Sequence, residues 1–482
     1  MIPGGYAADP MNTPINKERA SESLQSFLHL VDTRLTPVSA RAHVGIRSGA
    51  MALEKFIIEG GHRLKGEVSA SGSKNSALPI IAATILAEGA CSLGNVPRLR
   101  DVDVLAKIMQ TLGVGVERDP LGRLNTKVIN EEASTAPYEL VSMMRASFCV
   151  IGPLLAKRGY AKVSLPGGCA FGDRPVDLHL KGLRALGAEI KIEHGYVIAK
   201  AKKLRGANIY LGGNMGSSVL GTGNVMMAAA LAEGQTVIEH AACEPEVVDL
   251  ANFLIAMGAS IEGAGSHRIR IRGVRKLEGC SYDVISDRIE AATLLMAAAM
   301  TRGEVIVKNI DPTHLEAVFD KFKEAEIGFN RNCKVVAVGQ EVRPKEVEIA
   351  TLPYPGFPTD LQAQMMALMS IGRGASVFID GIYPDRLNHV AELKRMGAKV
   401  LRVNNTCVVI GQEKLQAAPV MASDLRAGAA LVIAALAAEG ETHVRRIYHI
   451  DRGYENFENK LRSLGAVIKR APDDAPENPP AV

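Results

Sequence analysis

The chain has 482 residues, which is long enough for two or three domains that each bury a full core. Hydrophobic residues make up 47% of the chain and charged residues 22%, and the dispersed Lys and Arg residues leave a net charge of only +4. With no tryptophan and 4% aromatic residues, this composition is typical of a globular protein and does not indicate a nucleic-acid-binding surface. The longest apolar run, residues 427–438, is too short to predict a membrane span.

Seven cysteines without a Cys-x-x-Cys pair argue against a disulfide framework and against a zinc site. This cysteine usage favours a reducing, cytoplasmic location. No group of His, Asp and Glu residues has the spacing of metal ligands, so we expect neither a metal nor another cofactor.

Residues 1–52 stand outside the pattern that organises the rest of the chain. They contain neither a periodic apolar face nor the apolar h-region of a signal peptide. Because Met51 begins a segment that looks like a fresh protein start, we interpret this stretch as a disordered leader or an extension of the gene model. A cleaved organellar transit segment is the alternative, and the acidic residues of the stretch weaken it. At the other end, the acidic and Pro-rich residues 471–482 are expected to be disordered.

One pattern recurs six times between these ends: an apolar helix that stops at a glycine, a short strand, a more polar helix that ends in a Leu-Gly-Ala-like turn, and further strands. The glycines that end the apolar helices are 70, 75, 69, 71 and 66 residues apart. They are Gly89, Gly159, Gly234, Gly303, Gly374 and Gly440. The second helix of the fourth copy is degenerate, because Ala325, Glu326 and Ile327 replace the glycine turn. Six repeats of about 70 residues predict an α/β fold.

The third copy shows how one unit is built. Residues 224–232 are apolar on every face, which predicts a helix that is buried all round. Residues 236–238 are β-branched and predict a strand, and Pro245 fits the first turn of a second, half-buried helix over residues 246–257. Helices that alternate with strands favour parallel strand pairs.

Six such units predict two similar domains of three units each, with three buried helices per domain. We expect the seam between the third and fourth units, near residues 286–288. The opening strand, predicted over residues 56–68, could join either domain. Two domains with a cleft are a frequent place for a small-ligand site.

The residues just before each apolar helix are polar and often charged. They include Lys74, Arg145, Ser217, Arg288, Asp360 and Arg426. Helix N-termini carry unpaired N–H groups and the positive end of the helix dipole, so six of them predict one shared surface that suits anions. For Ser73, Ser217 and Thr359, ordinary helix capping explains the residue equally well. Lys74 and Arg426 favour an anionic ligand more strongly, because a cation opposes the dipole at that end.

A second unusual feature is the segment 164–175, which places Cys169 among glycines and near Arg174. Nearby positive charge lowers the pKa of a thiol and makes it more reactive, and the glycines allow the loop to open and close. A hairpin turn with an incidental cysteine is the alternative. The other six cysteines lie in or beside regular segments and are expected to be unreactive.

At these residues the chain resembles the UDP-N-acetylglucosamine 1-carboxyvinyltransferase family of enolpyruvyl transferases. The resemblance covers roughly residues 53–470. Its motifs are Gly-Ser-Lys-Asn-Ser-Ala-Leu-Pro at 72–79, Pro-Gly-Gly-Cys at 166–169, Arg-Pro-Val-Asp-Leu at 174–178, Phe-Pro-Thr-Asp-Leu-Gln-Ala-Gln at 357–364 and Arg-Ile-Tyr-His-Ile-Asp-Arg-Gly-Tyr-Glu at 446–455.

The resemblance implies a fold of two inside-out α/β barrels, with three repeats in each and the opening strand joined to the later half. It therefore implies a discontinuous first domain over residues 53–73 plus 285–470, and a second domain over residues 74–284. It also implies the reaction. The 3-hydroxyl of UDP-N-acetylglucosamine adds to C2 of phosphoenolpyruvate while C3 takes a proton, and phosphate then leaves the tetrahedral ketal. This is the first committed step of peptidoglycan synthesis.

Roles for individual residues follow from the same resemblance. Cys169 is the expected proton donor to C3 and can bond covalently to phosphoenolpyruvate, while Asp360 is the expected base at the 3-hydroxyl. The remaining expected catalytic residues are Lys74, Asp424 and Arg452. The expected phosphoenolpyruvate-binding residues are Lys74, Asn75, Arg174, Arg386, Arg426 and Arg452. The expected UDP-N-acetylglucosamine-binding residues are Arg145, Arg174, Pro175, Val176, Asp177, Leu178, Gly216, Ser217, Ser218, Val219, Asp360 and Ile382.

The chemistry suits these roles, because phosphoenolpyruvate carries about three negative charges that several cations must hold as phosphate departs. The expected partners are these two small molecules, with no nucleic acid and no membrane span. The sequence leaves the oligomeric state open, and a monomer is compatible with it.

Three departures from the family pattern stand out. Leu220 replaces a small residue, which affects the expected contacts of residues 216–219. Asp173 adds a negative charge beside Arg174 that could raise the pKa of the Cys169 thiol. The leader has no family counterpart.

Two other functions compete with this one. The sister enzyme that transfers enolpyruvate to shikimate 3-phosphate (3-phosphoshikimate 1-carboxyvinyltransferase) shares the fold and the cations, and the Pro-Gly-Gly-Cys loop separates the two. A paralogue that binds a UDP-sugar without turnover is the other alternative, and the intact set of expected catalytic residues argues against it.

Overall fold

The computed structural model describes residues 53–166, 176–213 and 216–473. The expectations for the leader, for most of the tail and for Cys169, Arg174 and Pro175 therefore concern residues outside the described ranges. The described residues form one compact unit around two hydrophobic cores. The first core takes its buried residues from 56–70 and 289–468, and the second core takes them from 77–284.

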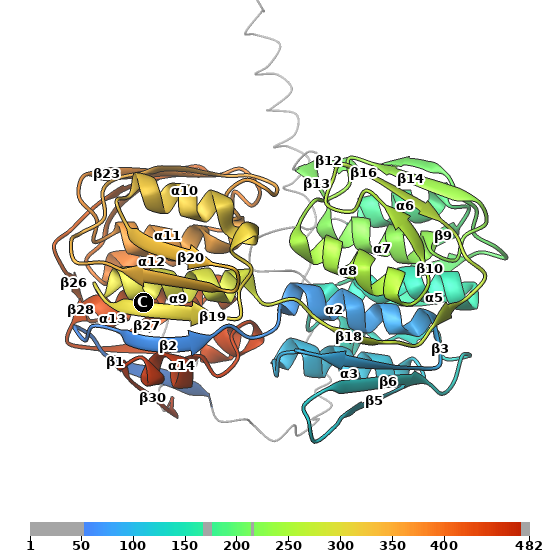
Figure 1. The fold of residues 1–482 in the computed structure, drawn as a ribbon, viewed down its shortest axis with the longest axis horizontal. Coiled ribbons are helices and arrows are strands. Elements are labelled where there is room, and N and C mark those ends of the chain that lie inside the picture. The colour runs from blue at the N-terminus through green and yellow to red at the C-terminus, as the bar shows by residue number, and fades with distance from the viewer. Residues whose placement is uncertain (1–52, 167–175, 214–215, 474–482) are drawn as a thin grey trace, which may run out of the picture. The chain divides into compact units, whose positions relative to one another are not determined.

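Six mostly apolar helices lie in these cores, in agreement with the predicted pattern. Their side chains are buried on almost every face because they carry long runs of Ala, Leu, Ile, Val and Met. The second core holds α2 (Lys74–Ala83), α5 (Ile151–Arg158) and α7 (Val219–Ala229), and the first core holds α9 (Arg288–Met300), α11 (Gln362–Met369) and α13 (Leu425–Ala437). Figure 1 shows each set of three helices enclosed by its own sheets. Short 3₁₀ turns border them at η1 (Thr84–Leu86), η2 (Arg145–Val150), η4 (Thr359–Leu361) and η5 (Ile447–Arg452).

The second helices of the repeats pack against the two cores. They are α3 (Arg100–Thr111), α6 (Asp177–Ala185), α8 (Pro245–Ala256), α10 (Glu316–Glu324), α12 (His389–Arg395) and α14 (Phe457–Ser463), and two short elements, α4 (Tyr138–Val141) and η3 (Pro312–Leu315), lie beside them. Of the second helices, all but the mostly apolar α8 are more polar than the six buried helices, as predicted. The glycine turns after these helices have left-handed backbone, for example φ 96° at Gly187. In the degenerate fourth copy Glu326 takes the same conformation at φ 57°, so the turn survives without its glycine.

The turns that end the buried helices match the prediction in five copies and differ in one. Gly89, Gly159 and Gly234 have positive φ angles, as do Gly374 and Gly440. In the fourth copy, however, Arg302 has the left-handed conformation at φ 51°, and Gly303 does not. Gly303 is needed for another reason: a Cβ there would come within 2.1 Å of the Leu64 carbonyl oxygen.

The described residues contain six four-stranded sheets. Their strand orders are β18-β4-β6-β5, β7-β8-β10-β9, β11-β14-β16-β15, β2-β19-β21-β20, β22-β23-β25-β24 and β27-β29-β1-β30. Each sheet has one parallel pair, for example β18 with β4, and two antiparallel pairs. The expectation of parallel pairs is therefore correct for one pairing per sheet and wrong for the other two. In the second sheet, for example, a short hairpin at His194 and Gly195 joins the antiparallel strands β9 and β10, and β10 also pairs antiparallel with β8.

The strands of the second core are β4 (Ala90–Gly94), β5 (Val114–Arg118), β6 (Leu124–Val128), β7 (Thr135–Ala136), β8 (Tyr160–Ser164), β9 (Glu189–Glu193), β10 (Tyr196–Lys200), β11 (Asn208–Tyr210), β14 (Gln235–Glu239), β15 (Ser260–Glu262), β16 (Arg268–Arg272) and β18 (Ser281–Asp283). Those of the first core are β1 (Glu54–Glu59), β2 (Lys65–Ser69), β19 (Glu304–Lys308), β20 (Gly328–Asn332), β21 (Val335–Gly339), β22 (Glu348–Thr351), β23 (Ala375–Asp380), β24 (Lys399–Val403), β25 (Thr406–Ile410), β27 (Val420–Met421), β29 (Glu441–Arg445) and β30 (Val467–Pro472). Three two-stranded ladders join β3 (Ala87–Glu88) to β17 (Leu277–Glu278), β12 (Gly212–Gly213) to β13 (Gly216–Ser217), and β26 (Leu415–Gln416) to β28 (Ala438–Glu439).

The predicted opening strand over residues 56–68 is two strands. β1 lies between β29 and β30 of the last sheet, and β2 pairs with β19 of the fourth repeat. The chain therefore closes the sixth sheet with a strand from its own beginning. Glu54 pairs with Pro472, so β30 includes residues 471 and 472, which we expected to be disordered.

The chain passes between the two cores twice, and the two crossings lie against each other. The Ser73 N–H donates to the Ile285 carbonyl oxygen at 2.7 Å, and the Asp287 N–H donates to the Ser71 carbonyl oxygen at 2.8 Å. Gly72 pairs with Ser286 between them, and a Cβ on Gly72 would come within 1.6 Å of the Asn95 carbonyl oxygen. The crossing is where the sequence places the seam, although the domain boundaries themselves stay a prediction.

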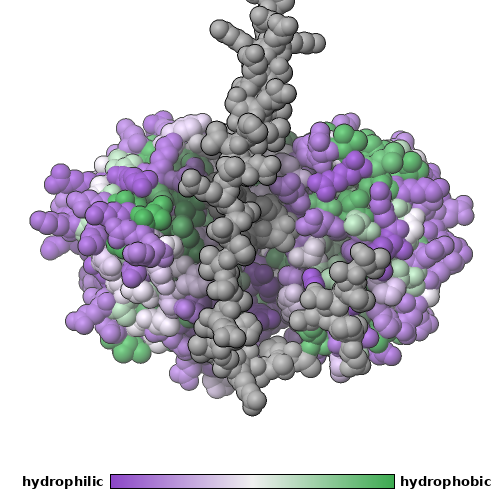
Figure 2. Space-filling model, turned by 180° about the vertical axis from the view of Figure 1, so that it is seen from behind, coloured by the Kyte–Doolittle hydropathy of each residue, from purple (hydrophilic) through white to green (hydrophobic). Residues whose placement is uncertain are grey.

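On the face seen in Figure 2, hydrophobic residues form separate patches between hydrophilic ones. Among residues 53–166, 176–213 and 216–473, no helix is long and apolar enough to cross a membrane.

Candidate active site

The N-termini of the buried helices meet at two adjoining cavities, as the sequence predicts. The larger, of about 380 Å³, is lined by the first residues of α2, η2, α7, η4 and α13, and we call it the cationic cavity. The smaller, of about 260 Å³, also receives the first residue of α9, and we call it the Glu244 cavity. Both cavities are lined by Asn75, Leu78, Ala146, Val219, Leu220, Asp360 and Tyr383.

Five cations line the cationic cavity: Lys74, Arg145, Arg386, Arg426 and Arg452. The carboxylates there are Asp101, Asp360 and Asp424. Burial and Arg145 lower the pKa of His179 to about 3, and burial and Arg452 lower that of His449 to about 4, so both histidines that line the cavity are neutral near pH 7. The positive charge of the cavity therefore comes from Lys and Arg side chains.

Asp101 holds two of these cations in place. Its Oδ2 accepts a hydrogen bond from Lys74 Nζ at 3.0 Å, and its Oδ1 accepts one from Arg452 Nε at 2.8 Å. Burial alone would raise the pKa of Asp101, but Lys74 and Arg452 outweigh burial and lower it. A charged Asp101 therefore fixes a cation of α2 beside a cation of η5.

Asp360 binds the next two cations at the border of the two cavities. Arg386 Nη1 donates to its Oδ1 at 2.7 Å, and Arg426 Nη2 donates to its Oδ2 at 3.0 Å. Asn75 Nδ2 approaches the same Oδ2 at 3.5 Å. Burial favours the neutral acid, yet Arg426 and Arg386 hold the pKa of Asp360 well below its usual range. The carboxylate is thus ionised and shared between two guanidinium groups.

Arg426 retains unused donors although its side chain is buried. Within the described ranges, its Nε and Nη1 atoms have no hydrogen-bond partner. The guanidinium lies over the ring of Tyr454 at 5.3 Å. Burial lowers the pKa of Arg426, but Asp360 more than compensates and raises it, so the charge is retained. A buried cation with unused donors beside a cavity is suited to an anion.

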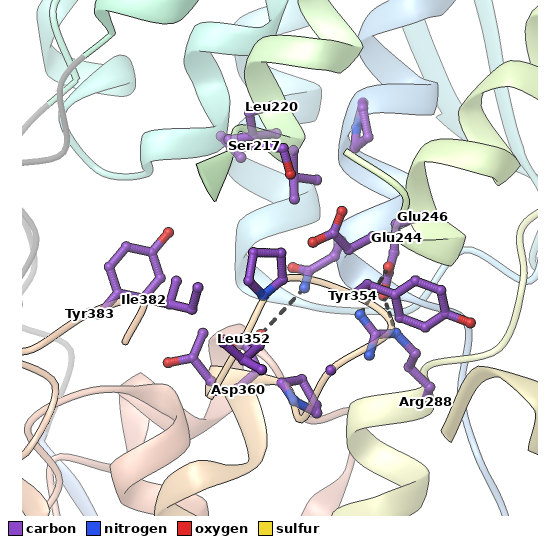
Figure 3. Close-up of a pocket in the computed structure, with 18 of the residues that line it drawn as sticks. Ser217, Leu220, Glu244, Glu246, Arg288, Leu352, Tyr354, Asp360, Ile382 and Tyr383 are labelled. Carbon is purple, nitrogen blue, oxygen red and sulfur yellow. Dashed lines mark hydrogen bonds and ion pairs between the residues drawn. The ribbon is translucent and has the colours of Figure 1, made fainter. Parts of the chain in front are cut away.

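The Glu244 cavity has a different charge. Glu246 is paired with Arg288, whose Nε and Nη2 atoms donate to the two carboxylate oxygens at 3.0 and 3.2 Å. This buried ion pair joins α8 of the second core to α9 of the first. Figure 3 shows Glu246 turned to Arg288 while Glu244 points into the cavity, with Leu352 and Tyr354 lining it.

A loop that follows β23 adds Tyr383 to the lining of both cavities and Ile382 to that of the Glu244 cavity. Asp380 fixes this loop, because its Oδ1 accepts hydrogen bonds from the Ile382 N–H at 3.0 Å and the Tyr383 N–H at 2.7 Å. Its Oδ2 accepts a hydrogen bond from the Thr359 hydroxyl at 2.9 Å. Asp380 therefore ties the loop to the turn that carries Asp360.

The structure brings together most of the predicted site residues that it describes. The cationic cavity is lined by Lys74, Asn75, Arg145, Ser218, Val219, Asp360, Arg386, Asp424, Arg426 and Arg452, and the Glu244 cavity adds Ser217 and Ile382. Val176, Asp177, Leu178 and Gly216 line neither cavity. Cys169, Arg174 and Pro175 lie outside the described residues.

Capping explains several of the polar residues at the helix starts. Ser73 accepts from the Ser76 N–H and Ser218, rather than Ser217, accepts from the Gly221 N–H. Thr359 does not cap its helix. Asp424 caps α13 by accepting from the Arg426 and Ala427 N–H groups at 2.9 and 3.0 Å. The carboxylate expected as a further acid in the cleft is thus engaged by the helix that carries Arg426.

Three carboxylates that line the cavities were not singled out from the sequence: Asp101, Glu244 and Glu246. Asp101 carries a weak signal, because it is an acid in the first turn of α3 and such residues are ordinarily explained by the helix dipole. Glu244 and Glu246 flank Pro245 at the start of α8, where the sequence predicts only a helix start. Their importance arises from contacts with residues far away along the chain.

A family model described as EPSP synthase (3-phosphoshikimate 1-carboxyvinyltransferase) matches residues 58–461. UDP-N-acetylglucosamine 1-carboxyvinyltransferase of Methylacidiphilum infernorum (isolate V4) is 50% identical over 419 residues, which cover 87% of this chain and 99% of the relative. The protein of the same name from Trichlorobacter lovleyi is 52% identical over 420 residues, with 87% and 99% covered. The chain belongs to the UDP-N-acetylglucosamine 1-carboxyvinyltransferase family.

Solved structures agree on the fold. The enolpyruvyl transferase NikO from Streptomyces tendae matches with a TM-score of 0.78 at 23% identity, over 87% of this chain and 99% of that one. EPSP synthase from Acinetobacter baumannii matches with a TM-score of 0.69 at 18% identity, over 87% and 100%. This member of the UDP-N-acetylglucosamine 1-carboxyvinyltransferase family therefore has the α/β fold of enolpyruvyl transferases, as the sequence motifs predict.

Proposed function

We propose that this protein transfers the enolpyruvyl group of phosphoenolpyruvate to the 3-hydroxyl of UDP-N-acetylglucosamine and releases phosphate. The 3-hydroxyl oxygen forms a bond to C2 of phosphoenolpyruvate, and C3 takes a proton to become a methyl group. The resulting ketal then loses phosphate from C2 and a proton from C3, which gives the enolpyruvyl ether. Family membership supports the reaction, and the cationic cavity supports the assignment of roles.

The cationic cavity is the proposed site of phosphoenolpyruvate. Its phosphate and carboxylate need several cations in a small space, and Lys74, Arg386, Arg426 and Arg452 are held there by Asp101 and Asp360. The unused donors of Arg426 favour an anion at this position. As phosphate leaves, these cations would stabilise the charge that it takes away. Arg174 completes the proposed set.

Asp360 is the proposed base at the 3-hydroxyl, and its position is the observation that carries the proposal. It lines both cavities, so a hydroxyl in the Glu244 cavity and C2 in the cationic cavity would meet beside it. Paired with Arg386 and Arg426 it is a weak base, because its pKa is held low. A bound anion that draws the two guanidinium groups to itself would raise the basicity of Asp360 at the moment a base is needed.

Cys169 is the proposed acid that protonates C3, and the nucleotide is proposed to contact residues 174–178 and 216–219. We further propose that the reaction is the committed step of peptidoglycan synthesis and takes place in the cytoplasm. The six cysteines that the structure describes are free thiols, which fits a reducing compartment.

Product analysis tests the proposal. The protein is incubated with phosphoenolpyruvate and UDP-N-acetylglucosamine in deuterium oxide, and the product is followed by ¹H NMR. The expected product has two vinyl protons, partly exchanged for deuterium through the methyl group of the ketal, and it does not form with Asp360→Asn. Absence of a vinyl ether with the unmodified protein would contradict the proposal.

A further inference from the structure

One carboxylate oxygen of Glu244 has no hydrogen-bond partner among the described residues. The residue occupies the N-cap position of α8, yet its side chain makes no capping hydrogen bond. Its Oε2 atom is buried and accepts no hydrogen bond from any described residue. In Figure 3 the side chain points into the Glu244 cavity, away from Arg288. A buried acceptor without a donor is rare in folded proteins and requires a partner, such as a ligand or an ordered water molecule.

The neighbouring cation, Arg288, forms its ion pair with Glu246 and not with the carboxylate of Glu244. The Nε and Nη2 donors of Arg288 are both directed at Glu246. Burial, and then Glu246, raise the pKa of Glu244, while backbone amides of Glu244 and Tyr354 and the charge of Arg288 act in the opposite direction. Glu244 is therefore a hydrogen-bond acceptor beside the ion pair of Glu246 and Arg288, in which the two charges already balance each other.

The charge of the cavity restricts what can bind there. The cavity is lined by three carboxylates, those of Glu244, Glu246 and Asp360, and by one guanidinium group, so it disfavours phosphate or a carboxylate. It favours a neutral group that carries O–H or N–H donors. The cationic cavity next to it has the opposite preference, and Asp360 lies between them.

These observations assign a different substrate group to each cavity. If Asp360 is to reach the reacting hydroxyl, the sugar must lie beside Asp360 on the side away from the cations. That side is the Glu244 cavity, where Leu352 and Pro353 offer apolar surface for the C–H face of a sugar ring. The N-acetylamino sugar is neutral and carries both hydroxyl and amide N–H donors.

We propose that Glu244 is a specificity-determining residue whose carboxylate accepts a hydrogen bond from a hydroxyl or amide N–H group of the sugar in the acceptor nucleotide. The inference rests on the proposed function and adds to it the group that recognises the sugar. An acceptor that presents phosphate and carboxylate groups at this position would be repelled by Glu244.

Calorimetric titration with UDP-N-acetylglucosamine and with UDP tests the inference, because UDP lacks the sugar. The variants are Glu244→Ala, Glu244→Gln and, as a matched control, Glu262→Gln on the exposed strand β15. In Glu244→Ala a hydrogen bond to a charged group is lost, so we expect this variant to bind UDP-N-acetylglucosamine about tenfold more weakly or worse. Glu244→Gln keeps an amide oxygen and should lose less. Binding of UDP should be unchanged in all three variants.

Equal weakening of UDP and UDP-N-acetylglucosamine in both Glu244 variants would overturn the inference, since it would indicate a general disturbance of the site. Unchanged binding of UDP-N-acetylglucosamine would also overturn it. If Glu244→Ala does not fold, the test is made with Glu244→Gln alone: its loss of affinity for UDP-N-acetylglucosamine is compared with its loss of affinity for UDP. The unmodified protein is assayed for acceptor-dependent phosphate release in parallel, so that failure of the proposed function is seen there and not in the variants.

Discussion

Asp360 Oδ2 and Arg426 Nη2 bind each other at 3.0 Å at the border of the two cavities, and Arg386 binds the other carboxylate oxygen. The proposed base of the reaction is thus held by two of the cations proposed to bind phosphoenolpyruvate. This arrangement connects anion binding to the basicity of Asp360, because the same guanidinium groups cannot serve both anions equally well.

Replacement of the proposed base should strongly lower turnover. We expect Asp360→Asn to lower kcat by about 100-fold or more, since an amide cannot accept the hydroxyl proton. Steady-state phosphate release measures the effect. Asp385→Asn, a neighbouring exposed carboxylate, serves as the control and should retain activity. A kcat within a few-fold of normal in Asp360→Asn would show that another group removes the proton.

The stability of the protein should fall steeply in acid because of Asp101. Its folded pKa is lower than the ordinary 3.8, so the folded state binds fewer protons than the unfolded chain below this pH. The stabilisation is complete above the ordinary pKa and is lost as the pH falls toward the folded value. Urea unfolding between pH 7 and pH 3 measures it. The difference in unfolding free energy between the unmodified protein and Asp101→Asn should narrow below about pH 4.

Comparison with the variant is needed because other acids act in the opposite direction. Burial raises the pKa of Asp249 and Glu290, and such groups bind more protons in the folded state. A difference between the two proteins that is constant over the whole pH range would contradict the assignment of Asp101.

The repeat pattern made most of the fold predictable. A helix that is apolar on every face must be buried. Gly89, Gly234 and Gly440 lie at positions where the backbone is left-handed. The pattern failed where another residue adopts the same backbone, as at Arg302 and Glu326, because no side-chain signal marks a left-handed Arg or Glu. The split of the opening strand into β1 and β2 was also hidden, since their partners are distant in sequence.

The cations of the site were predictable for a similar reason. A Lys or Arg at a helix N-terminus opposes the helix dipole, which made Lys74 and Arg426 stand out. Asp101, the carboxylate that pairs with Lys74, did not stand out, because an acid in the first turn of a helix is explained by its favourable interaction with the helix dipole. Glu244 and Glu246 were missed because their role depends on Arg288 and the cavity, which only the folded chain brings near.

The buried ion pair between Glu246 and Arg288 should be important for stability. Removing one partner of a buried pair leaves an uncompensated charge, so Glu246→Gln should lower the unfolding free energy by about 3–5 kcal/mol. A double variant that replaces both residues by apolar ones should lose less than Glu246→Gln. Urea unfolding measures both. As a control, Glu324→Gln breaks a more exposed pair with Lys321 and should change little. Equal stability of Glu246→Gln and the unmodified protein would show that the pair is dispensable.

Cysteine reactivity should be confined to few sites. Burial raises the pKa of Cys149 to about 12 and those of Cys280 and Cys407 to about 11, so these thiols are poor nucleophiles. We expect an epoxide antibiotic that alkylates the family cysteine to label Cys169 and to stop turnover. Peptide mass spectrometry locates the adduct, and Cys333→Ser removes the exposed thiol as a control. Retained activity with Cys169 unlabelled would indicate that Asp173 suppresses the thiol.

Phosphate release from phosphoenolpyruvate, with either UDP-N-acetylglucosamine or shikimate 3-phosphate as the acceptor, is the most direct test of the proposed reaction. We expect release with the nucleotide sugar alone, and loss of this release in Cys169→Ala. Release with shikimate 3-phosphate, or no release with either acceptor, would contradict it.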